Sequence, residues 1–200
     1  MTQSGSEMRE VDSREALPGG MNAWQYRSLV DATSFRTVLG HSPTAVSVLT
    51  TCDAEGCSHG ITVSSYASLS LDPPLVLACI DRRARIHRVL CSARSFSISV
   101  LNAEQEWVAR RFSSHTDDRF AGVDSSRGMS GNMLITGALA HLECDLADRH
   151  DAGDHSIIIG AVKFARARAG RPLLHFRGAY TELVGDRERL LDVSSESGNR

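Results

Sequence analysis

Residues 58–80, SHGITVSSYASLSLDPPLVLACI, contain the pattern that decides the fold. Ser58–Leu71 is rich in β-branched residues and hydroxyls, which predicts one or two strands. Asp-Pro-Pro at 72–74 interrupts the pattern with a turn, because proline fixes its φ and lacks a backbone N–H. Leu75–Ile80 is a short, continuously apolar run, which is typical of a buried strand. This stretch therefore predicts neighbouring β-strands.

Outside this stretch the chain predicts more short strands and a few helices. Strands are expected at 44–52, 96–101, 139–146, 156–165 and 173–183, and helices at 24–39, 82–93 and 104–114. Thr33 or Ser34 is the expected N-cap in the first helix, and Trp107 and Phe112 are expected to face inward in the last. Strands and helices do not alternate regularly, which disfavours a doubly wound sheet. The pattern predicts a mainly β fold with a few helices, a barrel or sandwich.

Length and composition are those of one globular domain with tails. The chain has 200 residues, 42% hydrophobic and 23% charged, so it is not wholly disordered. We expect a mobile N-terminal extension over 1–28, a domain over 29–185 and a disordered tail over 186–200. The net charge of −2 argues against a nucleic-acid binder, whose affinity rests on neutralising phosphates.

Segments for membrane insertion, export or disulfide bonding are not recognisable. No apolar run approaches the roughly 20 residues of a membrane helix. The start, MTQSGSEMREVDSRE, lacks the apolar stretch of a signal peptide. The five cysteines form no CxxC pair and are interpreted as small buried hydrophobic residues. We therefore expect a soluble, cytoplasmic protein that does not bind membranes.

Standard catalytic motifs are missing as well. The sequence contains no GxGxxG after a strand, no GxxxxGK[ST], no GxSxG and no clustered His/Cys spacing that offers a metal site. If the protein is an enzyme, the difficult chemistry belongs to a bound organic cofactor.

Several stretches have residues suited to such a cofactor. The hydroxyls between Ser58 and Ser70 can donate hydrogen bonds to a phosphate or a heterocycle, and Gly60 would let a planar ring approach the backbone. An edge strand with a polar outer face is the alternative. Arginines after the buried strand and at 110–111 can bind a phosphate, or form a solvated helix face. His155 lies where a turn enters a strand, and His175-Phe-Arg-Gly178 lies on the last strand, where it is alternatively plain packing.

Short motifs follow one another in order between Phe35 and Leu183. They are FRxxLG at 35–40 with Pro43-Thr44, SHGITVSS at 58–65, SLSLDPPLVL at 68–77, RSF at 94–96, ARRF at 109–112, DRFAG at 118–122, GDH at 153–155 and PLLHFRG at 172–178. Each is weak alone, but the ordered set resembles the flavin reductase family, the small reductase components of two-component flavin-dependent monooxygenases. Ala45 and Ser64 depart from the glycine and asparagine that many members have there.

The resemblance implies a split β-barrel that binds FAD or FMN at a homodimer interface. It also implies reduction of the flavin by NADH or NADPH, of which we expect NADH, and release of the reduced flavin to a separate oxygenase. Residues implied to line the flavin ring and ribityl chain are Ser58, His59, Gly60, Ile61, Thr62, Ser64 and Ser65. Residues implied on the ribityl–phosphate side are Cys79, Ile80, Asp81, Arg85, Ile86, Arg111 and Phe112. Residues implied to meet the nicotinamide nucleotide are His155, His175, Phe176, Arg177 and Gly178, with His155 orienting the nicotinamide as the catalytic residue.

Alternatives remain at this level. NADPH would need a cation near its 2′-phosphate, and 21 of the 22 basic residues are arginines, only Lys163 being lysine. A flavin-dependent oxidase of the pyridoxamine-phosphate-oxidase type would use the same barrel with tightly bound FMN. A non-catalytic dimeric flavin-binding module would bind flavin without turnover.

Overall fold

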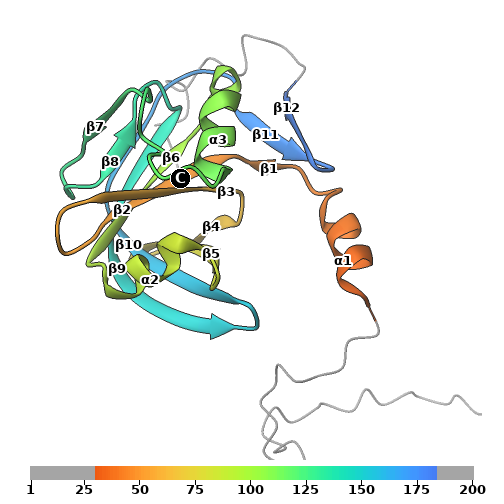
Figure 1. Ribbon diagram of the computed structural model, residues 1–200, viewed down its shortest axis with the longest axis horizontal. Helices are drawn as coiled ribbons and strands as arrows, with labels where there is room; N and C mark the ends of the chain where they lie inside the picture. Colours follow the sequence, from red (N-terminus) through yellow and green to blue (C-terminus); the bar gives the residue numbers. More distant parts are fainter. Residues whose placement is uncertain (1–29, 184–200) are drawn as a thin grey trace, which may run out of the picture.

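A computed structural model describes residues 30–183, and β-strand is the main secondary structure of this part (Figure 1). The mainly β fold with a few helices is confirmed. The predicted extension over 1–28 and the tail over 186–200 lie outside the described residues, as does the start of the helix expected at 24–39. None of the helices within 30–183 has the length and hydropathy needed to cross a bilayer.

Seven antiparallel strands form one curved sheet. In spatial order they are β3 (Ser58–Val63), β2 (Ser47–Cys52), β6 (Ser95–Val100), β9 (Ala140–Ala152), β10 (His155–Ala167), β5 (Pro74–Asp81) and β4 (Tyr66–Leu71). The two edge strands, β3 and β4, follow one another in the chain and are joined by Ser64 and Ser65. Because only two residues connect the edges, the sheet curls round into a barrel that is split between β3 and β4.

The barrel interior is an apolar core. Val76, Ala78 and Ile80 alternate along β5 with at most 6% exposure, and they pack with Phe96 of β6. Gly160 on β10 makes room for this aromatic ring, because a Cβ at position 160 would lie 2.4 Å from Phe96 Cζ.

A second core lies between the barrel and its outer elements. These are β1 (Thr44–Ala45), η2 (Ala103–Gln105), α3 (Glu106–Ser113), β7 (Ser125–Arg127), β8 (Met133–Ile135), β11 (Leu173–Phe176) and β12 (Ala179–Glu182). Val108 and Phe112 of α3 pack here against Val46 and Val48. This packing holds α3 against β2 and beside β3.

Two further helices lie outside the barrel. α1 (Ala32–Leu39) begins at Asp31, whose carboxylate accepts hydrogen bonds from the N–H groups of Thr33 and Ser34, each at 2.9 Å. The expectation that Thr33 or Ser34 is the cap is therefore wrong. α2 (Arg85–Ser92) begins later than predicted, because Ala84 N–H closes a turn onto Asp81 O at 2.9 Å.

Other expectations were wrong in detail. The strand expected at 173–183 is the hairpin β11–β12, and the hairpin β7–β8 was not predicted. The strand expected at 44–52 breaks at Val46, whose N–H donates to Leu173 O. Trp107 is 52% exposed rather than inward, since α3 buries the face that carries Val108 and Phe112. Cys57 and Cys91 are exposed, so the interpretation of all five cysteines as buried is wrong.

Candidate functional site

A cavity of about 240 Å³ opens where the starts of β3 and α2 face the loop after α3. Its lining residues are Ser58, His59, Gly60, Arg85, Ile86, Thr116, Asp117, Asp118, Arg119 and Phe120. The first five are residues that the sequence analysis assigned to flavin binding. A larger hollow of about 680 Å³ beside Arg94 and Arg127 contains none of the predicted residues.

Two arginines give the cavity its electrostatic character. Arg119 donates to Gly60 O and to Ser114 O, each at 2.7 Å, and Arg85 Nη1 lies 2.9 Å from Asp117 Oδ1. Burial, together with the nearby charge of Arg85, lowers the pKa of Arg119. A phosphate suits this cavity, because Arg85 can bind it with planar, paired hydrogen bonds and Arg119, whose Nη atoms donate to carbonyls, adds positive charge.

His59 is held by the carboxylate of Asp53, which lies in the turn between β2 and β3. Its Nε2 lies 2.8 Å from Asp53 Oδ2, and this hydrogen bond lowers the pKa of the Asp53 carboxyl. The ionised carboxylate accepts, so Nε2 donates and Nδ1 remains free to accept a hydrogen bond when the ring is neutral.

Gly60 does allow a ring to approach the backbone, but the ring is that of Phe112. A Cβ at position 60 would lie 2.4 Å from Phe112 Cε1. Phe112 is fully buried and makes an edge contact with Phe120, at 5.0 Å between ring centroids. Ile80 is 1% exposed in the barrel core. The side chains of Phe112 and Ile80 are therefore packed in the core, and a ligand could be contacted only by the backbone of these residues.

Arg111 holds the loop that lines the cavity without lining the cavity itself. Its Nη2 donates to Asp118 O at 2.8 Å and its Nε to Arg119 O at 3.2 Å. These bonds hold the loop that carries Arg119. Arg111 is thus a positioning residue for the cavity loop and does not line the cavity.

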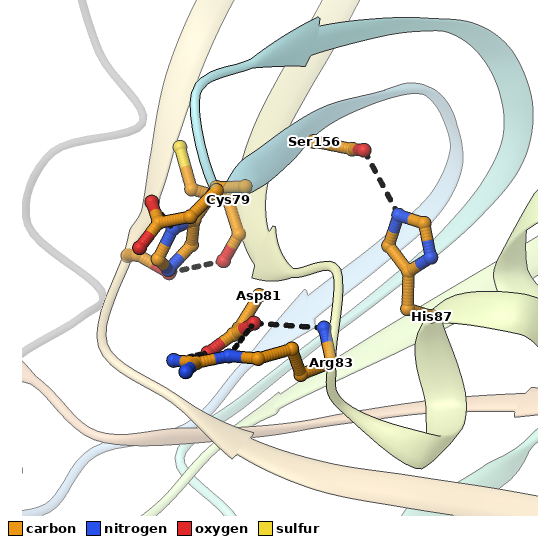
Figure 2. A network of polar contacts seen from close by, with 8 residues as sticks. Cys79, Asp81, Arg83, His87 and Ser156 are labelled. Atoms are coloured by element: carbon orange, nitrogen blue, oxygen red, sulfur yellow. Dashed lines mark hydrogen bonds and ion pairs between the residues drawn. The ribbon is translucent and has the colours of Figure 1, made fainter.

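A second predicted group gathers where β5 ends beside the start of β10. His155 pairs with Asp81 in register, and its Nδ1 lies 2.8 Å from Asp154 Oδ1. Arg83 donates to both carboxylate oxygens of Asp81 and lowers the pKa of that carboxyl to about 2 (Figure 2). Ser65 Oγ donates to Cys79 O at 2.7 Å, and burial raises the pKa of the Cys79 thiol. Ser65, Cys79, Asp81 and His155 thus lie together, although the resemblance assigned them to three different parts of the flavin and nicotinamide site.

The two groups are connected through α2. Asp81 ends β5, and Arg85, four residues later, begins α2 and lines the cavity. His87 Nε2 lies 2.9 Å from Ser156 Oγ (Figure 2). Ser156 Oγ in turn donates to Asp151 Oδ1 at 2.8 Å. This chain of hydrogen bonds fixes α2 against the β9–β10 hairpin that carries His155.

The remaining predicted residues lie elsewhere. Thr62 Oγ1 donates to Ala109 O at 2.6 Å and so joins β3 to α3, while Ile61 packs against the core and Ser64 is exposed. His175, Phe176, Arg177 and Gly178 lie on the β11–β12 hairpin, where Arg177 N–H donates to Gly40 O at 2.8 Å. Within the described chain this hairpin lies beside the end of α1 and contributes no lining residue to the cavity.

Comparison with known proteins identifies the family. A family model described as "Flavin reductase like domain" matches residues 39–184. The chain belongs to the flavin reductase-like family. The resemblance stated from the sequence is thereby confirmed.

Relatives of this flavin reductase-like chain are themselves reductases by name. It is 40% identical over 159 residues to "Flavin-dependent monooxygenase, reductase subunit HsaB" of Rhodococcus jostii, covering 79% of this chain and 81% of that protein. It is 38% identical to "Flavin reductase (NADH)" of Kitasatospora aureofaciens, covering 76% and 82%. The solved NADH:FAD oxidoreductase SgcE6 of Streptomyces globisporus, in complex with NAD and FAD fragments, superposes with a TM-score of 0.75 at 39% identity, covering 78% and 94%.

Five lining residues of the flavin reductase-like cavity were missed. Thr116, Asp117, Asp118, Arg119 and Phe120 all come from the loop after α3. The sequence did contain a signal, because DRFAG at 118–122 was part of the resemblance. Asp118 Oδ1 accepts the N–H groups of Phe120 and Ala121, each at 3.0 Å, which is the expected behaviour of aspartate at a turn. The motif was recognised, but no role was assigned to its arginine.

Proposed function

We propose that this chain reduces FAD or FMN with NADH and releases the reduced flavin to a separate flavin-dependent oxygenase. The observation that carries the proposal is that the cavity with Arg85 and Arg119 is joined through α2 to the place where Asp154 orients His155. Membership of the family and the reductase names of its relatives support the same function.

The donor set of the cavity fits the phosphate of a flavin nucleotide. Arg85 and Arg119 supply positive charge, and Ser58 and Thr116 line the cavity with hydroxyl-bearing side chains. α2 starts here and no side chain caps its N-terminus at Ala84, so its dipole adds to the attraction for an anion. A flavin bound at this position would supply the hydride acceptor.

His155 has the geometry to orient a nicotinamide. The lowered pKa of Asp154, caused by its hydrogen bond with His155, keeps the carboxylate ionised, so Nδ1 donates to it. In the neutral ring Nε2 then accepts a hydrogen bond, for example from the carboxamide N–H of nicotinamide. Holding the donor ring against the acceptor ring is the main requirement of hydride transfer, because positioning alone lowers such barriers substantially.

The active form is a homodimer under this proposal. α1 buries none of its side chains, and Phe35, Val38 and Leu39 are each more than half exposed. Phe176 of the adjacent hairpin is also exposed, so an apolar surface spans both elements. A second copy of the chain is the occupant that the family resemblance indicates, and it would bring His175–Gly178 to the site of its partner.

One assay tests the proposed function. NADH absorbance is followed with purified protein alone, then with added FAD, FMN or riboflavin, and the series is repeated with NADPH. Fast oxidation that requires added flavin supports the reductase. Tightly bound yellow cofactor that NADH does not bleach would instead indicate an oxidase, and binding without turnover would indicate a binding module.

A further inference from the structure

We propose that Asp117 occupies the position of the flavin phosphate on Arg85 and must leave when a phosphate-bearing flavin binds. The inference rests on the proposed function and deepens it, because it makes Asp117 a residue that sets the affinity for phosphorylated flavins. Nothing in the family resemblance assigns a role to this position.

The contact is the first observation. Arg85 Nη1 and Asp117 Oδ1 are 2.9 Å apart, and both residues line the same cavity. The two residues are 32 positions apart in sequence, so this ion pair bridges the start of α2 and the loop after α3. A carboxylate on a guanidinium uses the same donors that a phosphate would use.

The other charged groups of the cavity are already engaged. Arg119 donates to two backbone carbonyls, and Asp118 Oδ1 accepts two N–H groups of its own loop. Among the cavity's charged side chains, Asp117 is thus the anion that pairs with Arg85. The Asp117 carboxylate therefore repels an incoming phosphate and competes with it for the Arg85 guanidinium.

Release of Asp117 costs little. Its side chain is 96% exposed, so it can turn into water without losing packing, whereas Arg85 is 63% exposed. Exposed ion pairs are weak, because water screens the two charges and both side chains lose freedom in the pair. A phosphate, which carries more charge than a carboxylate, can therefore replace Asp117 on Arg85.

The test compares flavins with and without phosphate. Dissociation constants of FMN, FAD and riboflavin are measured by fluorescence quenching for the wild type, Asp117→Asn and Arg85→Gln. We expect Asp117→Asn to tighten FMN and FAD about two- to five-fold and to leave riboflavin unchanged. Arg85→Gln should weaken FMN and FAD and should likewise leave riboflavin unchanged.

A matched control separates this effect from the loss of any surface charge. Glu106→Gln removes a carboxylate from another exposed arginine pair, since Glu106 Oε1 lies 2.6 Å from Arg110 Nη2 on α3. It should leave all three constants unchanged.

Each other result overturns the inference in a distinguishable way. Weaker FMN binding in Asp117→Asn would make Asp117 a positioning residue for Arg85, and an equal change for riboflavin would remove the link to phosphate. If Asp117→Asn leaves the dissociation constants unchanged while Arg85→Gln weakens FMN and FAD binding, Asp117 does not compete with the phosphate. The proposed flavin site would then still hold. If Arg85→Gln also changes nothing, both the inference and this position of the flavin phosphate are wrong, whether or not the wild type oxidises NADH.

Discussion

Gly60 and Phe112 form a contact that no other residue at position 60 can make, because a Cβ there would lie 2.4 Å from the phenyl ring. β3 and α3 therefore approach each other closely at the cavity wall. Phe112 is fully buried, so its ring has no free space into which it can move.

Replacement of Gly60 by alanine should destabilise the fold. We expect Gly60→Ala to lower the free energy of unfolding by about 1–3 kcal/mol, the usual cost of overpacking a core. Urea denaturation followed by tryptophan fluorescence measures it. Ser58→Ala, on the same strand and the same cavity, is the control and should stay close to wild type. A Gly60→Ala variant as stable as the wild type would show that α3 can shift without cost.

His155 should matter for NADH more than for flavin. We expect His155→Ala to raise the KM for NADH by about ten-fold, the value of one hydrogen bond to a substrate, with little change in flavin affinity. Steady-state kinetics and flavin titration of the same preparation measure both effects.

The same hairpin provides the control for that variant. His150 also pairs with a carboxylate, with Nε2 3.1 Å from Asp148 Oδ2, so His150→Ala removes a comparable exposed imidazole. It should leave both constants unchanged. A collapse of flavin affinity in His155→Ala with normal NADH dependence would contradict the proposed role.

The exposed face of α1 should be required for dimerisation. Val38 is 69% exposed, and we expect Val38→Glu to produce monomers, because a charge cannot be buried unpaired in an apolar interface. Light scattering after size-exclusion chromatography measures the mass. Thr37→Glu on the same helix is a control for helix stability. A wild-type chain that is monomeric at all concentrations would contradict the dimer. The apolar face of α1 would then have to pack against another part of the same chain.

The stabilisation of the fold by the Asp81–Arg83 interaction should decrease only below about pH 4. The folded-state pKa of Asp81 is about 2, below the ordinary value of 3.8, owing first to the side-chain hydrogen bond from Arg83. The ionised carboxylate therefore stabilises the fold fully above about pH 4, and this contribution disappears as the pH falls toward 2. Urea denaturation of wild type and Asp81→Asn between pH 2 and 6 should give curves that differ above pH 4 and converge near pH 2. A constant difference over this range would show that ionisation of Asp81 is not the cause.

The sequence predicted the strands better than the connections between them. β5 was predicted from its apolar run, because the pattern reflects burial on the barrel interior. The hairpin β11–β12 was missed although Gly178 is a typical turn residue, because the reversal also places Arg177 at a positive φ of 50°, which is unusual for arginine. Asp31 lies two and three residues before the predicted caps, and only the observed hydrogen bonds identify it as the cap.

The cavity-lining residues that the sequence predicted are neighbours along one strand or one helix. Ser58, His59 and Gly60 are neighbours on β3, and Arg85 and Ile86 are neighbours on α2, so local patterns contained them. Arg119 was missed, because its significance depends on a hydrogen bond to Gly60, 59 residues away. The burial of Phe112 beneath Gly60 could not be predicted for the same reason, since it is a property of the folded chain.

The four-residue interval from Asp81 to Arg85 sets the distance between the end of β5 and the cavity, and therefore between the two sites of the proposed function. It has a fixed length, because the Asp81 turn sets one end and the His87–Ser156–Asp151 chain clamps the helix at the other. Engineering of this scaffold can exchange side chains at either end of the interval while keeping the spacing. A one-residue insertion in this interval would disrupt the turn from Ala84 N–H to Asp81 O and, under the proposed function, would separate the flavin site from the nicotinamide site.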